Sequence, residues 1–236
     1  MEICKICRKE KKLIKKSHII SKLLFKDLFE YNPKKSIIQF DIINPHKPIK
    51  KPSDTLYDNG LFCAECDGDN GMGIFEDYFK KYISNPKFII EQKAELDWII
   101  YTEYDFDKFF LFFNVQIYRA SLSTRNEFKM VKLNENILEK IRFNIINRKV
   151  NEKTNEIGII KFSEKSNFKN SIGSFRKIGE NYFIILRDFI VFYFFDKKDI
   201  LFSGMKGHII NKEKLIIPII PKTMEKEFIR SIIGIK

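Results

Sequence analysis

Two pairs of cysteines with the same spacing constrain this chain more than any other feature of its sequence. Cys4 and Cys7 stand in CKIC, Cys63 and Cys66 stand in CAEC, and the 236 residues include no other cysteine. Each CxxC segment places two sulfur atoms on one tight turn, and two such turns complete a tetrahedral zinc site. Four unrelated free cysteines would have no reason to share this spacing. We therefore predict one structural zinc ion held by all four cysteines.

The composition is that of a folded protein without a targeting segment. Hydrophobic residues make up 44% of the chain and aromatic residues 14%, which is enough apolar material for a substantial core. No apolar stretch of seven or more residues follows the basic N-terminus, and the run FFLFF at 109–113 is too short to cross a membrane. We expect a soluble cytoplasmic protein, in which thiols stay reduced and disulfides do not form.

The charge of the chain favours a polyanionic partner. The formal net charge is +12, which suits nucleic acid or an anionic membrane surface. The chain is also rich in Lys, Ile, Asn and Phe throughout, and such a bias yields a basic protein without any particular partner. Of these possibilities we expect nucleic acid, and no membrane.

Hydrophobic periodicity divides the chain into two parts of different character. The first part, which holds the cysteines, is expected to contain a strand at 17–20, a helix at 21–31, a proline-containing loop at 36–60 with a strand at 36–42, and a helix at 74–83. The second is expected to contain helices at 105–123 and 134–149, the latter capped by Asn134, then strands in IGIIKF, YFIILRDFIVFYFF, ILFSGMKGHII and KLIIPIIP, and a helix at 224–233.

These elements predict an α+β fold with a domain boundary near residues 85–100. Residues 1–90 would form a module organised by zinc. Residues 91–236 would form an α+β domain in which helices come first and a mostly antiparallel sheet follows. The second domain would select the target or bind a protein partner.

The order of the motifs resembles that of a known nuclease module. The first CxxC is followed eleven residues later by His18 in SHIIS, and the second CxxC opens the segment LFCAECDGDNGMGIFEDYFKKYI. This order is similar to a treble-clef zinc finger that carries an HNH site, also called a His-Me finger or ββα-metal site. SHIIS resembles the HHIIP motif of HNH nucleases and the SHIIPK motif of a bacterial HNH-like group. FNVQIYRASLSTRNEF and LNENILEKIR are similar to downstream helices of that group, so the resemblance covers residues 1–150, roughly.

The resemblance implies a metal-dependent endonuclease that hydrolyses phosphodiester bonds in DNA. In HNH enzymes one divalent ion, Mg²⁺ or similar, stabilises charge at the scissile phosphate, and a neutral histidine deprotonates water. His18 matches the position of this general base, and Glu76 matches the helix glutamate that would act in catalysis and bind the metal. The plainer interpretation of His18 is a half-buried strand residue. The plainer interpretation of Glu76 is a surface pair with Lys80 at i, i+4.

Further ligands of the catalytic metal are sought between the second cysteine pair and the helix. Asp67, Asp69 and Asn70 are candidates, although Asp69 or Asn70 would equally suit a helix cap. Ser17 stands just before the histidine, where many HNH motifs carry an acidic residue or a second histidine. The asparagine that braces the loop of this motif has two candidates here, Asn44 and Asn59.

A basic stretch surrounds the histidine and offers contacts to phosphate. Its members are Arg8, Lys9, Lys11, Lys12, Lys15 and Lys16. In a nuclease they would contact the backbone of the nucleic acid irrespective of base sequence. In the plainer interpretation they lie on a solvated hairpin. Arg119 and Arg125 either add to this surface or end a helix, and His46 and His208 are taken as incidental.

Two functions therefore compete at this point. The first is an HNH-type endonuclease that serves in bacterial (for example antiviral) defence or as a toxin-like effector, a role that only the resemblance implies. The second is a catalytically degenerate zinc finger that binds nucleic acid or a protein partner without cleavage.

Overall fold

The fold is given by a computed structural model of the chain, in which two compact units are each built from separate segments of sequence. Unit 1 comprises Met1–Glu30, Ser53–Pro86 and Asp105–Thr154, and unit 2 comprises Tyr31–Pro52, Lys87–Tyr104 and Asn155–Lys236. The structure describes residues 1–24, 39–40, 48–50, 56–84, 89–93, 96–101, 103–166, 168, 171–198 and 200–233.

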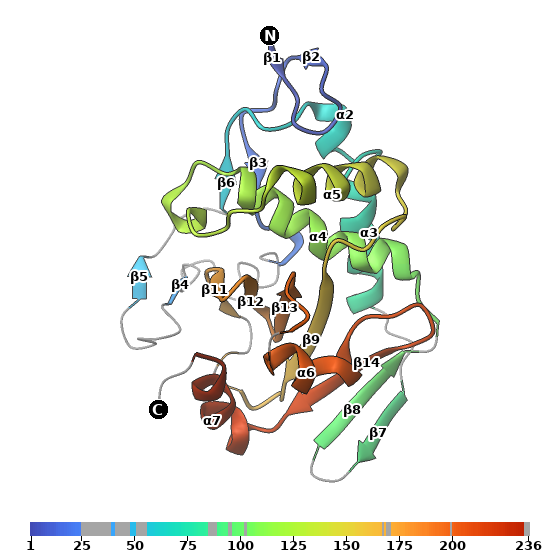
Figure 1. Cartoon of the computed structure of the whole chain (residues 1–236), viewed down its shortest axis with the longest axis vertical. Coiled ribbons are helices and arrows are strands. Elements are labelled where there is room, and N and C mark those ends of the chain that lie inside the picture. Colours follow the sequence, from blue (N-terminus) through green and yellow to red (C-terminus); the bar gives the residue numbers. More distant parts are fainter. Residues whose placement is uncertain are drawn as a thin grey trace. The chain divides into compact units, whose positions relative to one another are not determined.

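Unit 1 combines two small antiparallel strand pairs with a layer of helices (Figure 1). Its strands form the antiparallel pairs β1 (Glu2–Ile3) with β2 (Glu10–Lys11), and β3 (Ser17–His18) with β6 (Tyr57–Asp58). Its helices are α2 (Ala64–Asp67), α3 (Gly73–Ser84), α4 (Phe106–Leu122) and α5 (Glu135–Asn147), with a 3-10 turn η1 (Asn126–Phe128) between the last two.

The helices of unit 1 follow from local signals in the sequence. The carboxylate of Asp105 caps α4 by accepting the N–H of Lys108 at 3.0 Å. The side chain of Asn134 caps α5 by accepting the N–H of Ile137 at 2.9 Å, as its position predicts. α5 ends where Arg148 adopts a left-handed conformation with φ of 52°.

Aromatic packing joins α3 to α4. The ring of Phe79 stacks on that of Phe112 with centroids 3.9 Å apart, and it also contacts Phe109 and Phe113. α4 is buried almost all round, so it is an interior helix rather than an amphipathic surface helix. Polar side chains on such a helix need partners, because burying an unpaired polar group is costly.

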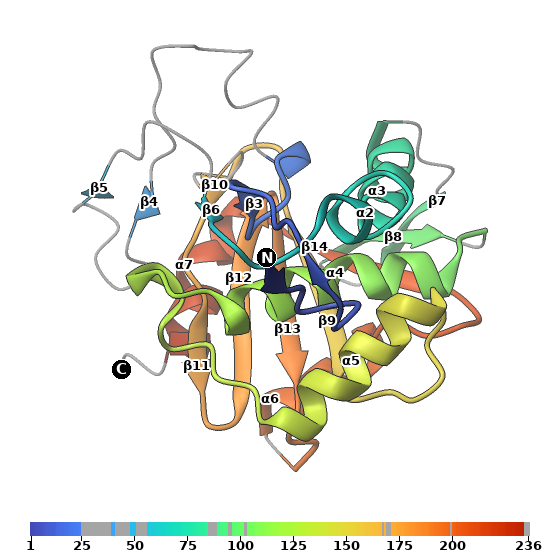
Figure 2. The same cartoon turned by 90° about the horizontal axis from the view of Figure 1, so that it is seen from above.

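Unit 2 is built around a mixed sheet whose central strands lie side by side in Figure 2. The strand order is β10-β12-β13-β9-β14-β8-β7, and β11 pairs with the same edge of β12 as β10 does. All these pairs are antiparallel except β14 with β9, so the predicted mostly antiparallel sheet is confirmed. The strands are β7 (Ile89–Lys93), β8 (Leu96–Tyr101), β9 (Glu156–Phe162), β10 (Ser171–Ile172), β11 (Arg176–Ile178), β12 (Asn181–Arg187), β13 (Phe189–Phe194) and β14 (Leu215–Ile220).

The remaining elements of unit 2 are short, apart from the last helix. They are the strand pair β4 (Gln39–Phe40) and β5 (Pro48–Lys50), the helices α6 (Ile200–Met205) and α7 (Lys222–Ile233), and the 3-10 turn η2 (Lys206–His208). The core of this unit is formed by apolar residues of β9, β12 and β13 together with Met205, Ile229 and Ile232. Among the described residues no helix is both long and apolar enough to cross a lipid bilayer.

Several predicted elements differ from the structure. The expected strand ILFSGMKGHII is wrong, since it forms α6 and η2 before Ile209 bridges Gly158. A short apolar run fits a helix or a strand equally well, and here Met205 packs into the core as part of a helix. Of the strand expected at 17–20, only Ser17–His18 is paired as β3. The helix expected at 21–31 and the strand at 36–42 lie mostly outside the described residues.

The division into units does not follow a single boundary near residue 90. α4 and α5, expected in the C-terminal domain, belong to unit 1, whereas β7 and β8 belong to unit 2. Local sequence patterns do not predict this division into units, because it depends on contacts between segments that are distant in sequence.

Candidate metal centre and histidine site

The two cysteine pairs come together in unit 1. Cys4 and Cys7 lie on the turn between β1 and β2, and Cys63 and Cys66 lie at the start of α2 and within it. The four Sγ atoms all lie within 4.8 Å of one another, and none is in a disulfide. In a tetrahedral zinc site with bonds of about 2.3 Å the sulfur atoms are roughly 3.8 Å apart. The four thiols therefore fit a metal such as zinc.

Backbone donors surround the sulfur of Cys4. Burial opposes ionisation of this thiol, but the N–H groups of Cys63, Cys7 and Ile6 lower its pKa to about 7. The N–H of Cys63 lies 3.4 Å from the sulfur. Burial and the neighbouring sulfur groups raise the pKa of Cys66, because negative charges on adjacent thiols repel one another. A divalent cation bound by all four sulfurs would offset this repulsion.

His18 lies on the short strand β3 of the same unit. Ser17 and His18 pair with Asp58 and Tyr57 of β6, and the N–H of Ile19 donates to the carbonyl of Leu56 at 2.9 Å. Ser17 and Ile19 are fully buried, whereas His18 between them is half-buried. Since successive side chains of a strand point to opposite faces, His18 points away from the face that Ser17 and Ile19 occupy.

Three charged side chains from three helices meet near His18. Arg119 of α4 donates through one terminal nitrogen to Oε1 of Glu76 at 2.6 Å and through the other to Oδ1 of Asp67 at 2.8 Å. Asp67 ends α2 and directly follows the metal-site residue Cys66, while Glu76 lies in the first turn of α3. The exposed side-chain fractions are 2% for Arg119, 11% for Asp67 and 24% for Glu76. The guanidinium is therefore buried and the two carboxylates are partly open.

The surroundings of His18 favour its neutral form. Burial lowers the pKa of the imidazole, and the positive charges of Arg119 and Lys22 act in the same direction. The negative charges of Glu76 and Asp67 act in the opposite direction, but burial outweighs them. Asp67 is also affected, because its burial raises the pKa of its carboxyl despite the Arg119 charge. A neutral imidazole can accept a proton, which is the property a general base requires.

One face of α4 carries the polar side chains that hold these segments. Oε1 of Gln116 accepts the N–H of Ser21, just after β3, at 2.8 Å. Arg119 follows three residues later. Ser123 comes directly after the end of α4, and its hydroxyl donates to Oδ2 of Asp58 on β6 at 2.8 Å. Positions i, i+3 and i+7 share one face of a helix, so this face of α4 contacts the segment after β3, the strand β6 and both carboxylates.

The structure brings together some of the predicted site residues and separates others. Glu76 and Asp67 lie near enough to His18 for their charges to affect the pKa of its imidazole. Asp69 and Asn70 are exposed, and the carbonyl of Asn70 accepts a hydrogen bond from Arg148. Asn59 is exposed at the end of β6, and Asn44 and His46 lie outside the described residues.

Fewer side chains are available to bind a second, catalytic metal ion than to bind zinc. Among the described residues, the four cysteines are the one group of three or more His, Cys, Asp or Glu whose ligand atoms lie within 4.8 Å of one another. Mg²⁺ needs only one or two carboxylates when substrate phosphates and water complete its coordination. Arg119 contacts Oε1 of Glu76, and Asp69 and Asn70 are exposed.

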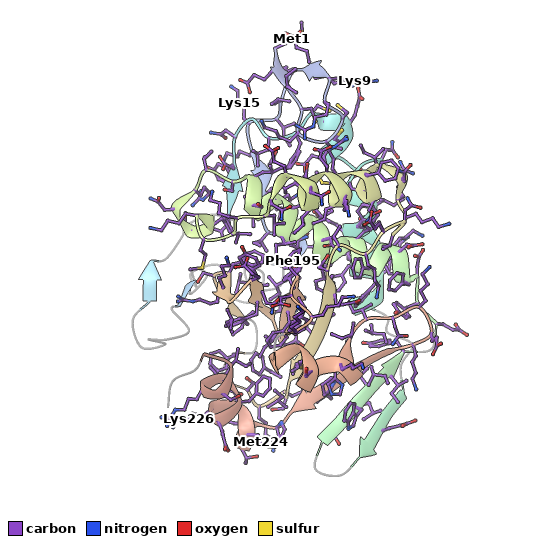
Figure 3. All side chains as sticks on the ribbon, in the orientation of Figure 1. Met1, Lys9, Lys15, Phe195, Met224 and Lys226 are labelled. Carbon is purple, nitrogen blue, oxygen red and sulfur yellow. The ribbon has the colours of Figure 1, made fainter. Side chains whose placement is uncertain are left out.

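Parts of the predicted basic surface are already paired. Arg8 forms an ion pair with Glu139, and Lys11 forms one with Glu65. The ammonium group of Lys16 lies over the ring of Tyr57, 4.8 Å from its centroid. Lys9, Lys12 and Lys15 are exposed, and Figure 3 shows Lys9 and Lys15 extending outward from unit 1. Lys22 is also exposed, and its positive charge acts on His18.

The role of Arg119 differs from the prediction. A position on the basic surface or at the end of a helix was expected, yet Arg119 is buried between Asp67 and Glu76. The available signal was its place within a long apolar helix, because a fully buried arginine is rare unless it is paired with acids.

Comparisons with known proteins do not assign this chain to a family. No family model matches the chain, and no curated protein and no solved structure is significantly similar to it. The function must therefore be argued from the residues themselves.

Proposed function

We propose that this chain is a metal-dependent endonuclease of the HNH type that hydrolyses phosphodiester bonds in DNA. The observation that carries the proposal is His18, a histidine kept neutral by burial on a short hairpin strand, beside Glu76 of the helix that follows the second cysteine pair. A neutral base next to a partly exposed carboxylate is what metal-assisted hydrolysis of a phosphodiester requires.

The order of elements in unit 1 supports a treble-clef finger with a structural zinc ion. A cysteine turn between β1 and β2 comes first, the antiparallel pair β3–β6 follows, and the second cysteine pair leads into helices. Zinc at Cys4, Cys7, Cys63 and Cys66 would fix the start of α2 against the first turn. Because Asp67 is the next residue after Cys66, the same ion would fix one edge of the histidine site. Reduced thiols of this kind agree with a cytoplasmic location.

The residues of the site divide the chemistry between them. An unprotonated ring nitrogen of His18 takes a proton from the attacking water. A divalent ion such as Mg²⁺, when bound by Glu76 and the substrate phosphate, would neutralise the charge that develops on the phosphate and the leaving oxygen. Asp67 and Arg119 hold Glu76 in place. The exposed lysines contact the DNA backbone without reading its sequence; they are Lys9, Lys12, Lys15, Lys16 and Lys22.

The second unit and the biological role belong to the same proposal. Unit 2 has its own core and sheet, which suits a part that selects the target or binds a protein partner. A basic nuclease of this kind fits bacterial defence or a toxin-like effector, as the resemblance of its motifs implies.

One observation favours a second function, a zinc finger that binds nucleic acid or protein without cleavage. Arg119 already occupies one oxygen of Glu76 and one of Asp67, which are the atoms that a metal-binding pair would offer. A site whose carboxylates are satisfied by a permanent cation has less capacity for a catalytic ion.

Plasmid cleavage separates the two functions. With Mg²⁺ or Mn²⁺ present, we expect His18→Ala to lower the cleavage rate by about 10²- to 10⁴-fold, which is the usual contribution of a general base. His208→Ala is the matched control, since His208 is also half-buried with a lowered pKa but lies in unit 2. Equal cleavage by the wild type and His18→Ala would remove His18 from the mechanism. Salt-sensitive DNA binding without cleavage in any divalent metal would establish the second function.

A further inference from the structure

We propose that Arg119 is a built-in counter-ion of the histidine site, which keeps Asp67 and Glu76 from binding a divalent cation together. The site would then hold its catalytic ion only weakly until DNA phosphate supplies further ligands. The second part of this inference rests on the proposed nuclease function. The first part concerns the residues alone and can be tested without cleavage.

The geometry places the guanidinium between the two carboxylates. One terminal nitrogen lies 2.6 Å from Oε1 of Glu76, and the other lies 2.8 Å from Oδ1 of Asp67. A divalent cation that bridged these two oxygen atoms would have to occupy the same space as the guanidinium. The planar fork of arginine suits this double contact, whereas the single ammonium group of lysine would not reproduce it.

The guanidinium cannot easily give way to such a cation. Arg119 is 2% exposed, and its Nε has no hydrogen-bond partner among the described residues. Once displaced from Asp67 and Glu76, the side chain would leave an unpaired positive charge in the interior, which is strongly unfavourable. The salt bridges therefore stabilise the folded state, and they withhold Oε1 of Glu76 and Oδ1 of Asp67 from an incoming cation.

The charges of the site lead to the same conclusion. Asp67 and Glu76 contribute two negative charges and Arg119 contributes one positive charge, so a single negative charge remains beside the neutral His18. The exposed Lys22 weakens even this attraction. On β6 the carboxylate of Asp58 is engaged by Ser123 and Thr124 and is not available. A site with a single net negative charge, whose two carboxylates each give one oxygen to Arg119, binds Mg²⁺ well only when phosphate oxygens join the coordination.

The test measures Mn²⁺ binding to the zinc-loaded, full-length protein in the absence of DNA, by paramagnetic broadening of the NMR signals of His18. We expect Arg119→Gln to bind Mn²⁺ roughly tenfold more tightly than the wild type or better, because it frees a second carboxylate and removes the competing charge. Misfolding would have the opposite effect and would weaken Mn²⁺ binding. An unchanged Mn²⁺ affinity in folded Arg119→Gln would overturn the inference.

Two further variants make the test secure. The double variant Arg119→Gln with Asp67→Asn removes the buried charge together with one partner, so it should bind Mn²⁺ as weakly as the wild type even where the single variant does not fold. Tighter binding by this double variant would contradict the counter-ion role. Arg142→Gln is the matched control, because Arg142 also pairs with a glutamate in unit 1 but contacts the carbonyl of Ile6 instead of the histidine site. Its Mn²⁺ affinity should equal that of the wild type.

The DNA-dependent part needs one more comparison. Inactive His18→Ala, observed through the signals of α3, should bind Mn²⁺ more tightly when duplex DNA is present than when it is absent. An affinity that DNA leaves unchanged would overturn this part of the inference. If the protein does not bind DNA at all, the proposed function fails, while the contrast between the wild type and Arg119→Gln still decides the role of Arg119.

Discussion

A histidine serves as a proton acceptor only where it is neutral at the working pH, and His18 reaches that condition through burial. The ordinary pKa of histidine is about 6.5, and burial together with Arg119 and Lys22 lowers the pKa of His18 below this value. The negative charges of Glu76 and Asp67 act in the opposite direction and limit the decrease of this pKa. Burial and the nearby positive charges thus lower the pKa of His18, while the two carboxylates raise it.

The pH dependence of cleavage should reveal this balance. Protonated His18 cannot accept a proton, so the rate should fall as the pH decreases through the pKa of His18. Because that pKa is lowered, half of the maximal kcat/KM should be retained at a pH below about 6.5. The measurement is a pH profile of plasmid cleavage at constant ionic strength. A profile whose acid limb has its midpoint at or above pH 6.5, at about the ordinary value, would contradict the buried, neutral base.

At the scale of elements, α4 is the part of unit 1 on which the site depends. Three side chains of this helix and its C-terminal end contact different segments. Gln116 accepts from Ser21 after β3, Arg119 donates to both carboxylates, and Ser123 donates to Asp58 of β6. Tyr118 of the same helix donates to the carbonyl of Lys5 at 2.9 Å and so also reaches the first cysteine turn. A helix that is buried nearly all round thus carries a polar contact to each segment of the site.

Replacing Gln116 should show how much one of these contacts contributes. Gln116→Leu removes the acceptor of the Ser21 N–H and leaves that buried group unpaired, which should lower the free energy of unfolding by about 1–3 kcal/mol. Asn114→Leu is the matched control, since Asn114 is equally buried in α4 but its amide donates only within its own helix, to Phe110, at 3.4 Å. Urea unfolding of both variants gives the comparison. An equal loss in the two variants would show that burial of the amide, and not the link to β3, determines the effect.

The elements that could be predicted from the sequence are those set by local signals. The helices at 105–123 and 134–149 have long apolar periodicity and good caps, and both were found at those places. The segment 200–208 was misassigned because its apolar run is short and fits either kind of element. The role of Arg119 could not be predicted in detail, because its partners stand 43 and 52 residues away in sequence.

At the scale of the molecule, each unit has a separate source of stability. Unit 2 rests on an apolar core between its sheet and helices, which includes Phe162, Ile185 and Phe192. Unit 1 has an aromatic core between α3 and α4, but its strand pairs are minimal and its four cysteines lie where one metal ion would cross-link them. The two units should therefore respond differently when metal is removed.

Chelation of zinc should unfold unit 1 and leave the sheet of unit 2 intact. Structural zinc contributes on the order of 10 kcal/mol to the folding of small modules, which matches the whole stability of many domains. Amide NMR signals of α3 and α5 should collapse on addition of a chelator, while those of β9, β12 and β13 persist. Signals of α3 that survive complete removal of zinc would show that the metal is dispensable for this unit.

The segmented path of the chain through its two units has a consequence for synthesis. His18 and all four cysteines leave the ribosome early, but Arg119 follows 101 residues after the histidine. At roughly 5–20 residues per second, the nascent chain carries an incomplete site for about 5 to 20 seconds. A product released before residue 119 would contain His18, Asp67 and Glu76 but lack the arginine that pairs with both carboxylates. The contacts that join α2, α3 and α4 can therefore form only after most of unit 1 has been synthesised.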